Sequence, residues 1–220
     1  MYVSSTGAIP ELPKGQAITE PKSFDPDLVV GGYSKTKAEA TQLVLDAIAA
    51  KKINASIVYP SGICGPNDYG NGYFTNFIID FVSGKLSAGF PGSFNSVDVR
   101  DLAEGVIACI EKGGNGEGYI LSNSKVYMAD LFHLIAKYTG AKDVKTIVPL
   151  PVIKVIAFFG SLATKFSKKP ILITTFAIYN LIRNNDFSCE KAKRVLGFNP
   201  RPYEETIRDM VLWLKNDGRI

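Results

Sequence analysis

Two apolar periodicities alternate along this chain, and each predicts a different kind of element. Short runs rich in β-branched residues, at 55–60 (ASIVYP) and 118–123 (GYILSN), predict buried strands, and residues 1–8 are expected to end a further strand. Helical spacing begins near residue 33, directly after a polar loop at 9–32 that contains several Pro and Gly residues. Strands that alternate with helices predict an α/β fold with a mainly parallel sheet.

Further helices are expected downstream, each marked by a cap or a stop signal. They are a helix from Tyr73 that Gly84 ends, one that Asp98 caps, one over 129–139 that Gly140 ends, one from Ser188 to Leu196 that Gly197 ends, and one after Pro202. Residues 61–72 are expected to be a loop. The glycine-rich stretch at 113–118 is expected to be a turn, because it follows a helix and precedes a strand.

Composition and charge exclude several classes of function. The chain has 220 residues, of which 46% are hydrophobic and 21% charged, as is ordinary for a globular protein with a sizeable core. The net charge is only +4 and no run of Lys or Arg stands out, so we expect no nucleic-acid partner. The start, MYVSSTGAIP, lacks the pattern of a signal peptide, and a cytoplasmic location is expected.

Cysteine and histidine usage predicts no metal site. The three cysteines are widely spaced without a CxxC pair, and His133 is the only histidine. This set does not supply the ligands of a zinc site and is typical of a reduced protein. Cys109 lies in a predicted buried helix stripe with Leu102, Val106 and Ile110, so we expect it to be a core residue.

The most apolar region is residues 147–166. Lys154 and Lys165 leave an uncharged run of ten residues between them, which is too short to span a bilayer. Two interpretations stay open: a helix that lines an apolar pocket or core, and a helix that lies on a membrane surface.

A tyrosine and a lysine, Tyr33 and Lys37, stand four residues apart at the start of the first predicted helix. The spacing alone does not identify a site. With 10 Tyr and 25 Lys or Arg in 220 residues, such a pair is expected about once by chance, and Tyr138 and Lys142 form another. That second pair straddles Gly140, the expected helix stop, whereas spacing of four within a helix brings two side chains together.

The residues before Tyr33 add chemistry to the first pair. Ser4, Ser5 and Thr6 follow a predicted strand, and the carboxyl ends of parallel strands face the crevice where such sheets bind ligands. An ammonium beside a phenol favours the phenolate, so Lys37 would bring Tyr33 toward general acid/base catalysis near neutral pH. A hydroxyl of Ser5 would hold a substrate carbonyl or alcohol while hydride moves.

These parts resemble the extended short-chain dehydrogenase/reductase family. The family includes NAD(P)-dependent sugar epimerases and dehydratases, 3β-hydroxysteroid dehydrogenases and dihydroflavonol-reductase-like enzymes. Five segments follow the family's order: VSSTGAI, YSKTKAEA, YPSGICGPND, VDVRDLAEG and KAKRVLGFNPRPYEETI. The resemblance implies that Tyr33 is the general acid/base, with Lys37 as its partner and as a ligand of the nicotinamide ribose. It implies Ser5 as the catalytic hydroxyl, with Thr6 as the alternative.

The resemblance also implies a nicotinamide cofactor, NAD or NADP, and the residues beside it. Pro60, Ser61 and Ile63 match the loop over the nicotinamide, whereas Asp98 and Asp101 are expected to be structural. The Gly-x-x-Gly-x-x-Gly turn that binds the pyrophosphate in this family does not occur in the 220 residues. We therefore interpret the chain as a truncated product, a misplaced start or one piece of a split protein. By itself it is expected to bind NAD(P)H poorly and to expose an apolar sheet edge.

The implied fold is the carboxyl-terminal part of a Rossmann-type parallel sheet plus a smaller, mostly helical substrate lobe. Residues 1–125 are expected to form the partial catalytic domain, and parts of 60–100 are expected to reach the substrate lobe. Residues 126–220 are expected to form mainly the lobe and the closing helices.

The segments PSGICGPNDYG and VDVRDLAEG, together with the mostly apolar and aromatic residues 148–182, resemble the dihydroflavonol-reductase-like and 3β-hydroxysteroid-dehydrogenase-like members of the family more than its sugar epimerases, and this resemblance implies the substrate class. The aromatic residues there are Phe158, Phe159, Phe166, Phe176 and Tyr179. They favour a ketone or alcohol reductase with an apolar or aromatic substrate.

Three alternatives stay open. A sugar-nucleotide epimerase or dehydratase needs basic side chains for a diphosphate, and Arg100, Arg183 and Arg201 would supply them if they converge on one pocket. A non-catalytic remnant or scaffold is an alternative of another class, because the phosphate-binding turn is absent. The third alternative concerns the oligomeric state: the chain could form a homodimer.

Overall fold

The computed structural model describes residues 1–86, 88–163 and 174–220, which divide into two compact units. The first unit consists of Met1–Gly65, Asn95–Lys125 and Asp186–Tyr203, and the second of Pro66–Phe94, Val126–Asn185 and Glu204–Ile220. Each unit is therefore assembled from separate stretches of the sequence. The functions expected of residues 1–125 and 126–220 remain predictions.

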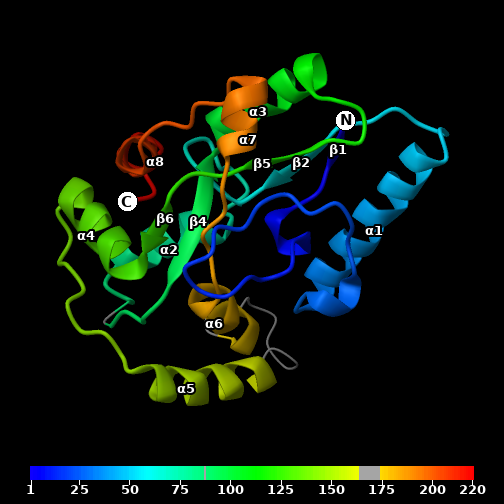
Figure 1. Cartoon of the computed structure of the whole chain (residues 1–220). Helices are drawn as coiled ribbons and strands as arrows, with labels where there is room; N and C mark the ends of the chain where they lie inside the picture. Colours follow the sequence, from blue (N-terminus) through cyan, green and yellow to red (C-terminus); the bar gives the residue numbers. More distant parts are fainter. Residues whose placement is uncertain (87, 164–173) are drawn as a thin grey trace. The chain divides into compact units, whose positions relative to one another are not determined.

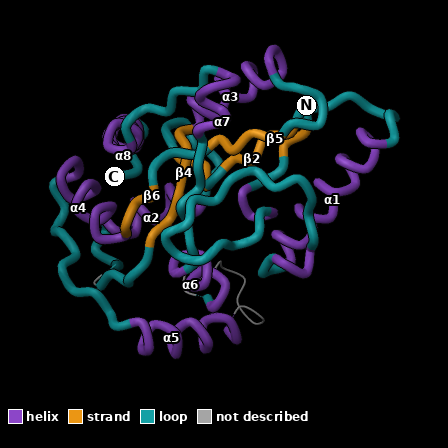
Figure 2. The backbone as a smooth tube through the Cα atoms, viewed as in Figure 1, coloured by secondary structure: helices purple, strands orange, loops and turns teal. Residues whose placement is uncertain are grey.

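A parallel sheet forms the centre of the first unit (Figures 1 and 2). Its strands β1 (Tyr2–Val3), β2 (Ile57–Pro60) and β5 (Gly118–Leu121) lie in the order β1-β2-β5, and both pairings are parallel. This confirms the predicted α/β fold and both predicted buried strands. β1 lies at one end of this strand order, and its Val3 side chain is 44% exposed.

Alternating side chains of this sheet enter two different cores, as the period of two in a strand requires. Ile57, Tyr59 and Ile120 pack against α1 (Gly32–Ala49) and the loop before it, which contains the short 3-10 turns η1 (Thr6–Ala8) and η2 (Pro26–Leu28). On the other side, Val58, Tyr119 and Leu121 pack against α3 (Val99–Lys112) and α7 (Glu190–Leu196). The sheet is thus covered on both faces, which explains the continuous apolar character of its strands.

The stretch 61–72 was expected to be a loop, and this prediction was wrong for β3 (Gly62–Cys64). This strand pairs in parallel with β4 (Ser93–Asp98), with Gly62 opposite Ser96. Three residues, two of them exposed, give no apolar run for a sequence pattern to detect. A Cβ atom at Gly62 would lie 3.1 Å from the Asn95 carbonyl oxygen, so a glycine permits this close pairing.

Helices form most of the second unit. They are α2 (Tyr73–Val82), α4 (Met128–Thr139), α5 (Leu150–Ala163), α6 (Thr175–Ile182) and most of α8 (Tyr203–Asn216), and β6 (Lys125–Tyr127) leads into α4. The rings of Phe77, Phe81 and Phe90 surround Phe132, with centroids 5.6, 5.7 and 6.4 Å from it. Four apolar residues of α8 are buried: Ile207, Met210, Val211 and Leu214.

Two helix details differ from the sequence-based expectation. Ile110 is 65% exposed, because the buried stripe of α3 runs through Leu102, Gly105 and Cys109 instead. Gly105 permits this, since a Cβ atom there would lie 3.0 Å from atoms of the Leu121 and Phe198 side chains. The N-cap of α7 is Cys189 and not Ser188, although the Ser188 hydroxyl accepts a long bond of 3.4 Å from the Glu190 N–H.

The three cysteines are free and buried, as expected for Cys109. Burial raises the pKa of the Cys64 thiol to about 12, and it raises the pKa of the other two thiols as well. Among the described residues, no helix combines the length and the apolar character that crossing a bilayer requires.

Candidate active site

The candidate site lies at the carboxyl ends of β1 and β2, which meet at one edge of the sheet because the strands are parallel. Ser4 follows β1 directly, and Ser61 follows β2. Tyr33 lies in the first turn of α1, behind the N-cap residue Gly31, whose φ of 96° is a conformation that favours glycine. Tyr33 belongs to the first unit and is 59% exposed.

The three consecutive hydroxyls after β1 have three different environments. Ser4 is buried, and its Oγ lies 2.6 Å from Thr41 Oγ1 on α1. Thr6 is also buried, and its hydroxyl donates to the Pro60 carbonyl at 3.3 Å. Ser5 is partly exposed, and its Oγ accepts a hydrogen bond of 3.0 Å from the Gly7 N–H, so that Ser5 caps η1.

Gly7 lies close to both Ser5 and Tyr33. A Cβ atom at Gly7 would lie 3.3 Å from Ser5 Oγ, 3.3 Å from Ser34 Oγ and 3.6 Å from the Tyr33 Cε1 atom. The Ser5 hydroxyl and the edge of the Tyr33 ring therefore both border a position that has no side chain of its own.

Lys37 connects α1 to the end of β1. Its Nζ donates to the Val3 carbonyl at 3.3 Å and lies 6.0 Å from the centroid of the Tyr2 ring. The Thr41 hydroxyl, which donates to the Lys37 carbonyl at 2.6 Å, links the same helix turn to Ser4. An ammonium has three donors, so one bond to Val3 leaves further donors for a ligand.

The predicted nicotinamide loop follows β2. Pro60 is buried as the last residue of the strand, and the Ser61 N–H donates to the Leu121 carbonyl at 3.1 Å. Ser61 Oγ is buried and has no hydrogen-bond partner among the described residues. Ile63 is 54% exposed, an unusual position for a large apolar side chain in a strand of the first unit.

These residues fit the riboside end of a nicotinamide cofactor. The Tyr33 hydroxyl and the Lys37 ammonium are donors of the kind that ribose hydroxyls accept, and Ile63 offers an exposed apolar surface for a planar ring. The unpartnered Ser61 hydroxyl adds a polar group at the same edge of the sheet. The described residues therefore offer both polar and apolar groups for this part of the cofactor.

Two of the three arginines considered for a diphosphate are engaged with carboxylates in the first unit. Asp98 caps α3, as predicted, and its carboxylate forms an ion pair of 2.7 Å with Arg100. Arg201 forms an ion pair of 2.7 Å with Asp101, and this bond raises the pKa of its guanidinium. In the second unit, Arg183 lies 5.9 Å from the centroid of the Tyr179 ring.

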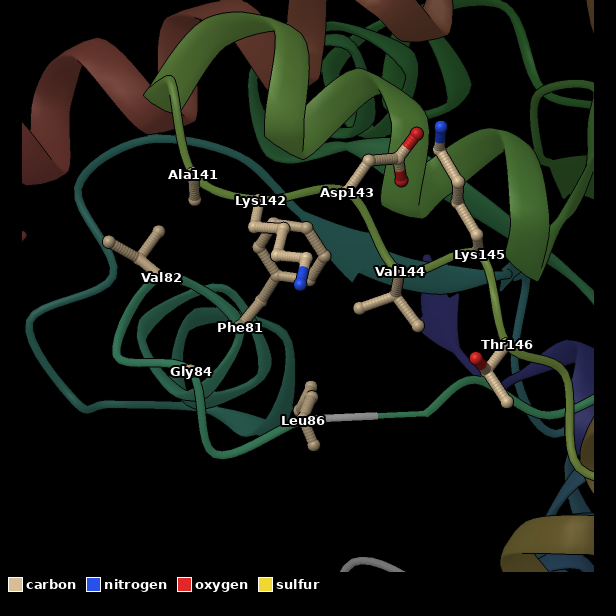
Figure 3. Close-up of a pocket in the computed structure, with 10 residues that line it drawn as sticks. All are labelled: Phe81, Val82, Gly84, Leu86, Ala141, Lys142, Asp143, Val144, Lys145 and Thr146. Atoms are coloured by element: carbon tan, nitrogen blue, oxygen red, sulfur yellow. The ribbon is translucent and has the colours of Figure 1, made fainter.

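A cavity of about 760 Å³ lies in the second unit, between the end of α2 and residues 141–146 (Figure 3). Its lining includes Phe81, Leu86, Lys142 and Val144. The Asp143 and Lys145 side chains point away from Leu86 in this view. None of the residues predicted for the catalytic site lines the cavity.

Sequence reasoning did not identify Gly7, Ser34 or Thr41 as parts of this region. Gly7 follows the three hydroxyls directly in VSSTGAI, and a glycine at a strand end is a signal for close backbone approach. Ser34 and Thr41 lie within α1 and are buried, and no local pattern distinguishes them from other small helix residues.

Comparisons with known proteins agree with the motifs. The model of the NAD dependent epimerase/dehydratase family matches residues 1–122. "Sterol demethylase protein B" of Methylococcus capsulatus is 26% identical over 230 residues, which cover 100% of this chain and 67% of that protein. "Putative dihydroflavonol 4-reductase" of Synechocystis sp. is 24% identical over 224 residues, which cover 100% of this chain and 65% of that protein.

Solved structures have the same fold. The crystal structure of gox2253 matches with a TM-score of 0.83 and 30% sequence identity, over 100% of this chain and 66% of that one. The chain thus spans about two thirds of the length of these relatives. Because the family model matches more than half of the residues, the chain belongs to the NAD-dependent epimerase/dehydratase family, as the motifs around Tyr33 predict.

Proposed function

We propose that this chain supplies the acid/base site and the substrate region of an NAD(P)-dependent reductase that interconverts a ketone and an alcohol on an apolar or aromatic substrate. One observation supports this most: Ser5 Oγ and the Tyr33 ring edge adjoin the same point above Gly7. Lys37, one helix turn after Tyr33, bonds the end of the strand from which Ser5 follows.

Each residue has a distinct task in this proposal. In reduction, the Tyr33 hydroxyl gives its proton to the substrate oxygen, and in oxidation the phenolate takes it back. The Ser5 hydroxyl donates a hydrogen bond to the same oxygen and orients the carbonyl. The Lys37 ammonium stabilises the phenolate by its charge. A bound nicotinamide supplies the hydride that the carbonyl carbon receives, so the proton and the hydride together make the alcohol.

The substrate class rests on the charge and polarity of the described residues. Arg100 and Arg201 form ion pairs with Asp98 and Asp101, and these carboxylates offset the positive charge that a diphosphate would need. Of the aromatic residues expected near the substrate, Phe176 on α6 is 40% exposed, and Phe166 lies outside the described residues. The two curated relatives are named for a sterol and for a dihydroflavonol, which agrees with an apolar substrate.

A second candidate, a sugar-nucleotide epimerase or dehydratase, is favoured by the description of the family itself. The two candidates differ in cofactor chemistry. A reductase consumes the reduced cofactor in proportion to product, whereas an epimerase regenerates its cofactor in each turnover. They also differ in the group that they bind, an apolar ring system or a diphosphate.

The test uses the complete reading frame, meaning the coding sequence of this chain with any in-frame sequence upstream of it. NADPH and NADH oxidation is measured with a panel of aromatic and alicyclic ketones, and sugar nucleotides are assayed for epimerisation or dehydration. Reduction of ketones but not conversion of sugar nucleotides is the expected result. Conversion of sugar nucleotides alone would favour the second candidate. Bound cofactor without turnover of any substrate would favour a non-catalytic remnant.

A further inference from the structure

The helix α5 presents an apolar face to solvent. Its large side chains that are at least 40% exposed are Val152, Val155, Ile156, Phe158, Phe159 and Leu162. Phe158 and Phe159 are each 62% exposed, and their rings pack edge to face with centroids 5.5 Å apart. A soluble surface helix normally places such residues toward the core, so this face calls for an explanation.

The opposite side of α5 already has a packing partner within the second unit. Ile153 and Ala157 are buried with Ile178 of α6, and Figure 1 shows α6 beside α5. The Ser161 hydroxyl donates to the Ala157 carbonyl, and it also accepts a 2.8 Å bond from the Thr175 N–H at the start of α6. The helix is therefore fixed by one stripe, and its exposed residues are not needed for that contact.

The exposed face contains no polar side chain. At 100° per residue, the six exposed apolar residues span an arc of about 160°, and the helix's polar side chains, Lys154 and Ser161, fall outside it. Protein interfaces of ordinary composition make about one hydrogen bond per 100–200 Å². A face without donors or acceptors suits hydrocarbon better than such an interface.

The sequence on both sides of α5 carries charge of one sign. From residue 144 to residue 185 the sequence contains no Asp or Glu but six basic residues: Lys145, Lys154, Lys165, Lys168, Lys169 and Arg183. Residues 165, 168 and 169 lie outside the described part of the chain. Lys154 is exposed at the border of the apolar arc, one helix turn before Phe158. A second copy of the chain would bring the same positive charge, whereas an anionic surface would complement it.

We propose that the exposed face of α5 docks on an anionic lipid surface. The Phe158 and Phe159 rings enter the boundary between headgroups and acyl chains, and Lys154 stays at the level of the anionic headgroups. The helix lies in the plane of the surface and does not cross it. This inference goes beyond the proposed reaction, because it requires neither cofactor nor turnover.

The test is flotation of the purified chain with vesicles, in which bound protein rises with lipid and aggregated protein sinks. The vesicles are phosphatidylcholine alone, and phosphatidylcholine with about one third phosphatidylglycerol. We expect flotation with the anionic vesicles at low salt, and weaker flotation at high salt because salt screens exposed charges. Phe158→Ser with Phe159→Ser should lower the bound fraction at least ten-fold, and Lys154→Gln should lower it about five-fold on anionic vesicles only.

The matched control replaces two apolar residues on other helices that are at least as exposed, Leu43→Ser with Ile110→Ser, and should float like the parent chain. Circular dichroism shows whether each variant is folded. Absence of flotation of the parent chain, equal flotation on neutral vesicles, or unchanged flotation of the folded double Phe variant would each overturn the proposal. A dimer that the double Phe variant dissociates, without flotation of the parent, would assign the face to a second copy instead.

Discussion

Two tyrosine–lysine pairs with the same spacing have different surroundings, one in each unit. Tyr33 and Lys37 lie in one continuous helix, next to Ser5 and the end of a parallel strand. Tyr138 lies in the last turn of α4, and Gly140 then ends the helix with a φ of 77° before Lys142. The Tyr138 hydroxyl donates to the Glu204 carboxylate at 2.6 Å.

This difference shows that the spacing of a tyrosine and a lysine does not by itself identify an acid/base pair. Glu204 raises the pKa of the Tyr138 phenol through this hydrogen bond, which disfavours the phenolate. Lys142 lines the cavity of the second unit and is not on the same helix as Tyr138. Helical continuity and a neighbouring hydroxyl therefore distinguish the first pair, and the second pair is a natural control for it.

The largest effect is expected from Tyr33→Phe in the complete reading frame. Loss of the proton donor should lower kcat at least about a thousand-fold, within the range of general acid/base contributions. Tyr138→Phe removes an equivalent hydroxyl and should leave kcat within about two-fold. Steady-state rates of ketone reduction check both variants. Equal losses in the two variants would contradict the distinction between the pairs.

Lys37→Met should lower kcat by about a hundred-fold, because the phenolate loses its neighbouring charge. The same change at the second pair, Lys142→Met, should have no measurable effect on turnover. The thermal midpoints of both variants must be compared with the parent, since Lys37 also bonds the Val3 carbonyl. A loss of rate that tracks only a loss of folded protein would argue for a structural function of Lys37.

Ser5→Ala should lower kcat by tens of fold, because the substrate oxygen loses one oriented donor. Thr6→Val, at the alternative hydroxyl, should instead lower the free energy of unfolding by about 1 kcal/mol through loss of the bond to the Pro60 carbonyl. Kinetics and chemical denaturation of both variants separate these effects. If Thr6→Val lowered kcat and Ser5→Ala lowered only the free energy of unfolding, Thr6 would be the catalytic hydroxyl and Ser5 the structural one.

Gly7→Ala should lower kcat by about ten-fold, since its Cβ would come within 3.3 Å of Ser5 Oγ and crowd the edge of the Tyr33 ring. Gly32→Ala is the matched control, because a Cβ atom there meets no atom within 4 Å. Full activity in Gly7→Ala would show that the space above Gly7 is not used.

The smallest expected effect is on the pH dependence of the free energy of unfolding. The pKa of Cys64 is raised to about 12 by burial in the folded state, so the folded chain keeps this proton longer than the unfolded chain does. The contribution of the neutral Cys64 thiol to the free energy of unfolding is fully present below the ordinary thiol pKa. This contribution is lost as pH rises from there toward 12. Cys64→Ala should flatten the fall in unfolding free energy between about pH 8.5 and 10.5. An unchanged slope would exclude Cys64 as its cause.

The sequence was sufficient where local signals and packing agree. The strands at 57–60 and 118–121 and the Asp98 cap follow from apolar runs and cap chemistry, and the structure has them. The sequence was insufficient where tertiary contacts determine which side chain is buried or exposed. Three adjacent hydroxyls look equivalent in VSSTGAI, and only the turn η1 separates Ser5 from Ser4 and Thr6. Ile110 fits a helix stripe by spacing, but the close approach at Gly105 rotates the buried face away from it.

The same reasoning applies to residues 147–166. A segment that is apolar around its whole circumference does not reveal which side is buried, and both interpretations of it stayed open for that reason. The structure buries Ile153 and Ala157 and exposes Phe158 and Phe159, while residues 164–166 lie outside the described part.

A double-mutant cycle between Ser5→Ala and Tyr33→Phe tests most directly that these two residues act on one substrate oxygen. The rate of hydride transfer is measured in a single turnover of the complete reading frame, for the parent, both single variants and the double variant. Residues that act as a unit give non-additive effects, so the double variant should be no more than about three-fold slower than Tyr33→Phe alone. Losses that multiply in full would show that Ser5 and Tyr33 act independently and would contradict the proposed site.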